Sequence, residues 1–211
     1  MTEPSRPNRL KRVRLTLWLL VGLAVIGAGA LLLIRRGTVD APAASTLNPA
    51  MGGSFTLVGT DGQPFLSNRL EGKPYAIFFG FTHCPDVCPT TLARLAKLRQ
   101  SMGGDDAFNV VFVSIDPERD GPKEMREYST LFQTPIIALT GSPRQIDQVK
   151  KSYGIFAEKA PGPTSHAGHS GYSMNHTSSV LLFDRNGRLA GIISATDSDD
   201  AALGKLKAIT A

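Results

Sequence analysis

The two cysteines are the residues best placed to do chemistry in this chain. They are its only cysteines, Cys84 and Cys88, and they lie four positions apart in the segment FTHCPDVCP. On a turn that opens into a helix, this spacing would place both sulfur atoms on one helical face. Two thiolates there can bind a soft metal ion, or they can close a strained, reducible disulfide. Because so short a loop restrains the unfolded chain little, we interpret the pair as reactive rather than structural.

The histidines are the next candidates for metal ligands, because imidazole, like thiolate, is a suitable ligand for copper and zinc. His83 adjoins the first cysteine, and since neighbouring side chains diverge, we interpret it as a turn histidine. His166 and His169 have the spacing H-x-x-H, with Met174 nearby. They could form a weak outer copper site, although a solvated polar loop explains the same residues. The fourth histidine, His176, ends this Gly/Pro/Ser/His-rich stretch.

Hydrophobic periodicity predicts the elements that position these residues. Apolar or alternating runs predict strands at 55–58, 75–79, 110–115, 136–139, 179–183 and 189–193. Helical spacing predicts helices at 90–102, 122–132, 143–153 and 199–209. Ser142 is expected to cap the third helix, and Asp199 or Asp200 the last. The segment 157–175 is predicted to be a loop, and Asp184 to Gly187 a hairpin turn.

The order of these elements predicts an α/β thioredoxin-like sandwich. Three strand–helix units are followed by a β-hairpin and a final helix, and the cysteines lie at the first strand-to-helix junction. A helix N-terminus at that junction would activate thiols electrostatically. The strand after His176 should bring this histidine to face the dithiol, although a loop histidine without a special role is the alternative.

An N-terminal transmembrane helix is expected in front of this domain. Residues 15–34 are twenty residues without a charge, which is long enough to cross a bilayer. Five basic residues precede the span and two follow it, so residues 1–14 are expected in the cytoplasm. Residues 35–50 read as a linker, and residues 51–211 as the domain outside the cytoplasm. A cleaved signal peptide is the alternative, since Ala28-Gly29-Ala30 offers small residues.

The charge distribution argues against a nucleic-acid partner. The formal net charge is +5, but seven of the 23 Lys and Arg residues, and one of the 18 Asp and Glu residues, lie in residues 1–36. The remainder is nearly neutral, so it lacks the basic surface that nucleic acids require.

Several separated motifs resemble those of one known family. They are Gly80–Thr90, Ser114–Asp120, Leu139–Ser142 and Asn175–Ser178. In order and spacing, over about residues 50–210, the chain resembles the Sco/SenC family, membrane-anchored copper proteins that assist assembly of cytochrome c oxidase. The resemblance implies a thioredoxin-like fold and copper bound by Cys84, Cys88 and His176.

The resemblance also points to Asp116, the first acid of a D-P-x-R-D motif. A carboxylate at the end of a buried strand could orient His176 or serve as a weak oxygen ligand to Cu(II). Alternatively, it caps the turn 117–121. Arg119 and Asp120 are expected to form a local ion pair or a partner-docking contact.

The expected function is therefore that of a copper metallochaperone and thiol-disulfide factor for the dinuclear copper centre of cytochrome c oxidase. Its expected partners are the copper-centre subunit and another periplasmic copper chaperone or thiol reductase. The expected location is the inner membrane, with the domain in the periplasm or the mitochondrial intermembrane space. Three alternatives remain open: a metal-free thiol-disulfide oxidoreductase with His176 as a helper base, a peroxidase-like enzyme with Cys84 as its reactive thiol, and a copper sensor.

Overall fold

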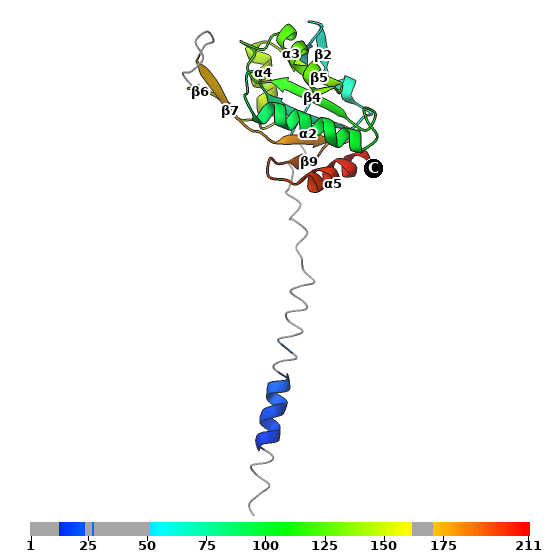
Figure 1. The fold of residues 1–211 in the computed structure, drawn as a ribbon, viewed down its shortest axis with the longest axis vertical. Coiled ribbons are helices and arrows are strands. Elements are labelled where there is room, and N and C mark those ends of the chain that lie inside the picture. The colour runs from blue at the N-terminus through cyan, green and yellow to red at the C-terminus, as the bar shows by residue number, and fades with distance from the viewer. Residues whose placement is uncertain (1–12, 24–26, 28–50, 162–170) are drawn as a thin grey trace, which may run out of the picture. The chain divides into compact units, whose positions relative to one another are not determined.

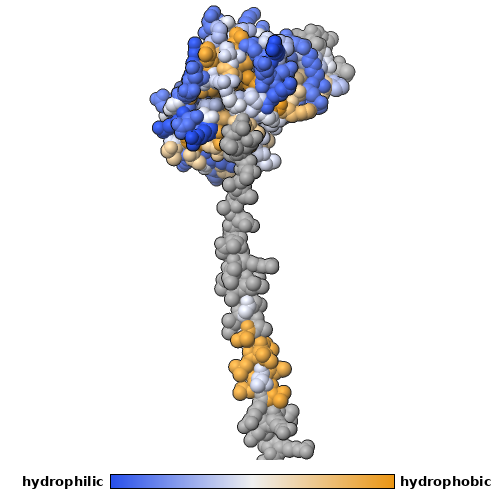
Figure 2. Space-filling view, turned by 180° about the vertical axis from the view of Figure 1, so that it is seen from behind, coloured by the Kyte–Doolittle hydropathy of each residue, from blue (hydrophilic) through white to orange (hydrophobic). Residues whose placement is uncertain are grey.

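The computed structural model describes residues 13–23, 27, 51–161 and 171–211. The chain divides into two compact units, Met1–Thr46 and Leu47–Ala211. In the first unit, residues 13–23 are helical and their large apolar side chains are exposed, and Figure 2 shows them as an orange patch with a few paler residues. Among the described residues, no helix is both long enough and apolar enough to cross a membrane. Half of the predicted span 15–34 lies outside the described residues.

The second unit is built on a seven-stranded sheet in the order β2-β1-β5-β4-β3-β8-β9. Its strands are β1 (Thr56–Gly59), β2 (Pro64–Leu66), β3 (Tyr75–Gly80), β4 (Asn109–Ser114), β5 (Ile136–Thr140), β8 (Val180–Phe183) and β9 (Leu189–Ile193). The three central strands β3, β4 and β5 are parallel, and β3 pairs with β4 in register from Tyr75↔Asn109 to Gly80↔Ser114. Every residue of β3 is buried, as expected for a parallel strand covered on both faces.

Four helices accompany the sheet (Figure 1). They are α2 (Val87–Ser101), α3 (Pro122–Ser129), α4 (Pro143–Ser152) and α5 (Asp199–Thr210), with short 3₁₀ turns at Ser67–Leu70 and Thr130–Phe132. Ser142 caps α4 through a capping box with Gln145, as predicted. Ser198 caps α5, so the prediction of Asp199 or Asp200 at this position was wrong. Both acids lie instead in the first turn, where the helix dipole favours negative charge.

The segment that the sequence predicted as a loop, 157–175, contains a β-hairpin. Strands β6 (Ala157–Pro161) and β7 (Tyr172–His176) pair antiparallel, from Ala157↔His176 to Pro161↔Tyr172, and form a separate two-stranded sheet. Figure 1 shows this hairpin projecting at the side of the main sheet. The prediction failed because both strands are largely polar and carry no apolar pattern. His166 and His169 lie outside the described residues.

Candidate metal centre

The junction between β3 and α2 positions the two cysteines. Helix α2 begins at Val87, three residues earlier than predicted, so Cys88 lies in its first turn and Cys84 lies in the turn before it. The pair therefore does not share a helical face, which corrects the sequence-based geometry. The Cys88 backbone N–H donates to the Cys84 sulfur over 3.4 Å. The Cys84 sulfur thus accepts a hydrogen bond from one of the N–H groups in the first turn of α2, which have no partner within the helix.

The two thiols differ in burial and in acidity. Cys88 is fully buried, whereas Cys84 is half-buried. A side-chain hydrogen bond from Cys88 is the main cause that lowers the pKa of the Cys84 thiol. Donation to Cys84, together with burial, raises the pKa of the Cys88 thiol. The arrangement places a thiolate on Cys84 and a proton on Cys88, and a metal ion that binds both sulfurs would displace this proton.

His176, the last residue of β7, completes the group. Its Nδ1 lies 2.9 Å from the Thr177 carbonyl oxygen, which can only accept, so the proton resides on Nδ1. Its Nε2 lies 3.8 Å from the Cys88 sulfur. The rings of Phe78 and Phe81 contact the imidazole edge-on, with centroids at 6.1 and 5.9 Å. These contacts hold the Nε2 lone pair toward the sulfurs, as a metal-binding histidine requires.

These three side chains form a compact donor set. The sulfurs of Cys84 and Cys88 and a ring nitrogen of His176 all lie within 4.8 Å of one another. Within the described ranges, this is the one group of three or more His, Cys, Asp or Glu residues that could hold a metal ion. Two thiolates and one imidazole suit Cu(I) or Zn(II). A pocket of about 370 Å³ adjoins the group, and Cys84, His176 and Met174 lie on its wall.

Asp116 is buried, and its carboxylate bonds to Arg119 and Tyr172 rather than to the cysteines or His176. Its Oδ2 accepts from Arg119 Nε, and its Oδ1 accepts from the Tyr172 hydroxyl over 2.8 Å. Its backbone carbonyl accepts from the N–H groups of Arg119 and Asp120, which closes the turn. The structure therefore does not bring this carboxylate into the donor set. Its connection to His176 runs through Tyr172, at the other end of β7.

Asp120 was not recognised as a site residue, yet it holds the cysteine loop in place. It is fully buried and accepts from Thr82 N–H at 3.0 Å, Thr82 Oγ1 at 2.6 Å and Ser114 Oγ at 2.7 Å. Arg119 pairs with Asp116 and not with Asp120, so the predicted ion pair between Arg119 and Asp120 was wrong. The alternative of a partner-docking contact stays a prediction. Ser114 could have indicated the role of Asp120 from the sequence, since a hydroxyl at the end of a buried strand requires a hydrogen-bond partner.

His83 occupies the turn between these groups, as interpreted from its position. Its Nδ1 lies 3.1 Å from Thr82 Oγ1 and 3.6 Å from Asp120 Oδ1. It therefore belongs to the network that supports the loop rather than to the donor set.

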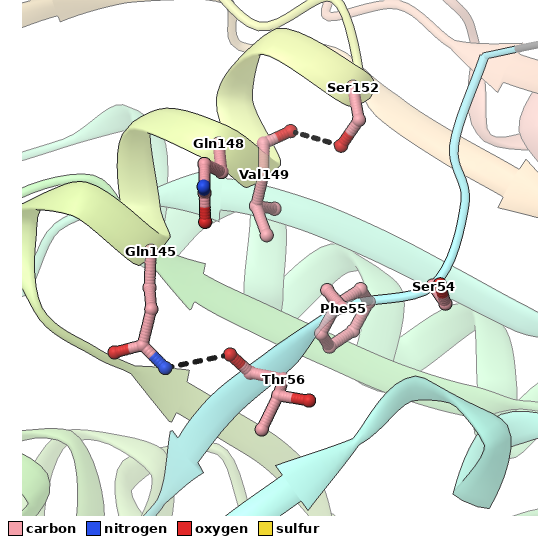
Figure 3. Close-up of a pocket in the computed structure, with 7 residues that line it drawn as sticks. All are labelled: Ser54, Phe55, Thr56, Gln145, Gln148, Val149 and Ser152. Atoms are coloured by element: carbon pink, nitrogen blue, oxygen red, sulfur yellow. Dashed lines mark hydrogen bonds between the residues drawn. The ribbon is translucent and has the colours of Figure 1, made fainter.

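A second pocket, of about 460 Å³, lies between β1 and α4 (Figure 3). It is lined by Ser54, Phe55, Thr56, Gln145, Gln148, Val149 and Ser152. Gln145 spans it and donates to the Thr56 carbonyl over 2.9 Å. The lining of this pocket offers neither a charged side chain nor a thiol.

Comparison with known proteins shows the family to which the chain belongs. The SCO1/SenC family model matches residues 43–211. The chain belongs to the SCO1/SenC family. An SCO2-like protein of Rickettsia conorii is 34% identical over 171 residues, which cover 78% of this chain and 82% of that relative. The Saccharomyces cerevisiae mitochondrial protein SCO2 is 32% identical over 160 residues, covering 75% of this chain and 52% of the yeast protein.

Solved structures place this SCO1/SenC chain beside copper-bound relatives. The structure of Bradyrhizobium japonicum ScoI with copper bound superimposes with a TM-score of 0.66 at 38% identity, covering 76% of this chain and 99% of that one. Yeast Sco1 with copper bound gives a TM-score of 0.66 at 26% identity, covering 76% and 88%. These matches confirm the predicted α/β thioredoxin-like fold.

Proposed function

We propose that this SCO1/SenC protein binds one copper ion through Cys84, Cys88 and His176 and delivers it to the dinuclear copper centre of cytochrome c oxidase. The observation that carries the proposal is the convergence of two sulfurs and the Nε2 side of one imidazole within 4.8 Å. Soft thiolates select Cu(I), and imidazole accommodates both oxidation states of copper. The copper-bound ScoI and Sco1 structures support the choice of metal.

Delivery would proceed by stepwise exchange of ligands. Cys84 is the more exposed sulfur and lies on the wall of the pocket, whereas Cys88 is buried behind it. A thiolate of the copper-centre subunit would therefore reach the metal from the side of Cys84. Another periplasmic copper chaperone or thiol reductase is proposed as the source of copper or electrons.

The same dithiol supports a second role as a thiol-disulfide factor. The two sulfurs are close, and both cysteines are free. Attack by the Cys84 thiolate on a partner disulfide forms a mixed disulfide, and attack by Cys88 then releases it. The partner disulfide gains two electrons from Cys84 and Cys88, one proton from Cys88 and one proton from water to become two thiols, while Cys84 and Cys88 become a disulfide. The oxidised pair cannot bind copper, so the redox state would control metal loading.

We also propose that residues 15–34 anchor the protein with residues 1–14 in the cytoplasm. Residues 35–50 would act as a linker, and residues 51–211 would lie in the periplasm or the mitochondrial intermembrane space. The exposed apolar side chains of 13–23 support an anchor, and curated relatives named mitochondrial support the location. Carbonate extraction of membranes tests this, and a soluble, shortened protein would identify a cleaved signal peptide instead.

The copper site is tested by titrating the reduced full-length protein in detergent with Cu(I) against a competing chelator. We expect one tightly bound copper, a large loss of affinity in Cys84→Ser and Cys88→Ser, and a smaller loss in His176→Ala. Undiminished affinity in either serine variant would refute the site. The Cys84→Ser/Cys88→Ser protein also tests the predicted weak site of His166, His169 and Met174, since residual copper that is lost in His166→Ala/His169→Ala would reveal it.

A further inference from the structure

The β6–β7 hairpin that ends in His176 is joined to the loop 116–120 through Tyr172. The Tyr172 hydroxyl donates to Asp116 Oδ1 over 2.8 Å. Arg119 stacks on the same ring, with its guanidinium carbon 3.8 Å from the centroid, and its Nη1 donates to the Tyr172 carbonyl over 3.1 Å. Arg119 also pairs with Asp116. These three side chains form the Asp116–Arg119–Tyr172 cluster.

The other strand of the hairpin reaches the same loop through Lys159. Its ammonium lies 4.6 Å from the Tyr172 ring centroid, and it pairs with Glu118 at 2.7 Å. Both partners of this ion pair are exposed, and exposed pairs contribute little stability. The cluster around the buried Asp116 carboxylate is therefore expected to contribute more to the attachment, and the Lys159–Glu118 pair provides a matched control.

In the part of the chain that the structure describes, the hairpin is not paired with the main sheet, so side-chain contacts such as these hold it against the rest of the unit. β7 pairs only with β6 in the two-stranded sheet of the described residues. Tyr172 and His176 are its first and last residues, and a strand of that length spans roughly 13 Å at about 3.3 Å per residue. Fixing Tyr172 thus fixes one end of a short rigid element whose other end presents the imidazole.

Arg119 is held among several groups at once, with one of its donors unsatisfied among the described residues. Its side chain is 13% exposed, and its Nη2 is buried without a hydrogen-bond partner in the described structure. A buried donor without a partner is unfavourable. The planar guanidinium nevertheless contacts a carboxylate, a carbonyl and two aromatic rings at once, since the Phe81 ring lies 5.8 Å away. A lysine could not make this set of contacts.

We propose that Arg119 is a positioning residue for copper binding, which acts through Tyr172 to hold His176 against the two thiols. This inference rests on the proposed function, since it assigns His176 a role at the metal. Residues that orient metal ligands typically contribute about 10- to 100-fold to affinity. Because imidazole matters more to Cu(II) than to thiolate-dominated Cu(I), the effect should be larger for Cu(II).

The test uses full-length protein in detergent and the variants Arg119→Leu, Arg119→Lys and Tyr172→Phe, with Glu118→Gln as the control. We expect about a tenfold loss of Cu(II) affinity in Arg119→Leu, an intermediate loss in Arg119→Lys and Tyr172→Phe, and no change in Glu118→Gln. Electron paramagnetic resonance should show altered nitrogen coupling from the imidazole. Arg119→Lys and Tyr172→Phe roughly preserve side-chain volume, so the proposal can still be tested with them if Arg119→Leu does not fold.

A double-mutant cycle with His176→Ala separates positioning from general destabilisation. If Arg119 acts through His176, Arg119→Lys should cost no further Cu(II) affinity once the imidazole is absent. An equal loss in both backgrounds, or unchanged nitrogen coupling, would overturn the proposal. In metal-free protein, the ¹⁵N shifts of His176 should change in Arg119→Lys but not in Glu118→Gln. Wild-type protein that binds no copper would refute the proposed function, while these metal-free shifts would still decide whether Arg119 positions His176.

Discussion

At the residue scale, the two nitrogens of His176 have different roles. Nδ1 is committed to the Thr177 carbonyl, and this commitment leaves the Nε2 lone pair for a metal. The sequence could identify both cysteines, because their spacing alone limits their chemistry. Asp120 could not be identified in the same way, because its importance arises from Thr82, which is 38 residues away.

The difference in burial and acidity between the two thiols gives the first prediction. Because Cys84 is half-buried with a lowered pKa, while Cys88 is buried with a raised one, iodoacetamide should modify Cys84 first in the reduced, metal-free protein. Peptide mass spectrometry after brief labelling measures the ratio. Labelling of Cys88 at an equal rate would contradict the assignment of the thiolate to Cys84.

The buried carboxylate of Asp120 gives the second prediction. In Asp120→Asn, the amide can accept from fewer of the three donors that now reach the carboxylate, so the free energy of unfolding should fall by about 1–3 kcal/mol. Urea denaturation measures this change. Asp86→Asn, at an exposed position of the same loop, is the control and should unfold almost like wild type; equal stability of both variants would contradict the assigned role.

At the element scale, the junction of β3 with α2 and the hairpin show what the sequence reveals. The apolar run at β3 predicted a buried strand to within one residue, because burial on both faces leaves a clear pattern. The hairpin left no such pattern, since most residues of β6 and β7 are polar and their apolar residues do not alternate regularly with polar ones. The hairpin also contacts the loop 116–120 through Tyr172 and Lys159, residues that are 41 or more positions away along the chain.

Gly80, the last residue of β3, gives the third prediction. A Cβ at this position would lie 2.7 Å from the Cys88 sulfur and 3.0 Å from the Phe112 ring. Gly80→Ala should therefore displace this sulfur and weaken Cu(I) binding, although both thiols remain. Gly204→Ala is the matched control, because a Cβ there would meet nothing within 4 Å. A Gly80→Ala protein with wild-type affinity would show that the close packing behind Cys88 is unimportant.

At the scale of the domain, charged pairs join α2 to α5 and its preceding turn. Asp199 lies 2.9 Å from Arg94 Nε and 3.1 Å from Lys97 Nζ, and Asp197 lies 2.6 Å from Lys205 Nζ. Lys97 and Arg94 lower the pKa of Asp199, and Lys205 lowers that of Asp197. The pairs of Asp199 with Arg94 and Lys97 could not be predicted from one segment of the sequence, because their partners are 105 and 102 residues apart.

These carboxylates predict how acid changes stability. Their folded pKa values lie below the unfolded value of 3.8, so their contribution is complete above that value and is lost as the pH falls below it. Asp199→Asn should therefore lose less stability than wild type when the pH is lowered from about 5 to about 3. Urea denaturation at both pH values checks this. The difference between the two proteins in acid-induced loss of stability should shrink in high salt, because the pairs are exposed. An identical acid response in the two proteins would show that the pairs do not stabilise the fold.

The central claim is that one copper ion binds two sulfurs and one nitrogen from Cys84, Cys88 and His176. X-ray absorption spectroscopy at the copper edge, on full-length protein loaded with one equivalent of Cu(I), measures this ligand set directly. We predict two sulfur ligands and one imidazole nitrogen in wild type, with the nitrogen lost in His176→Ala and one sulfur lost in Cys84→Ser. A spectrum unchanged in Cys84→Ser, or a site built from nitrogen and oxygen alone, would contradict the account.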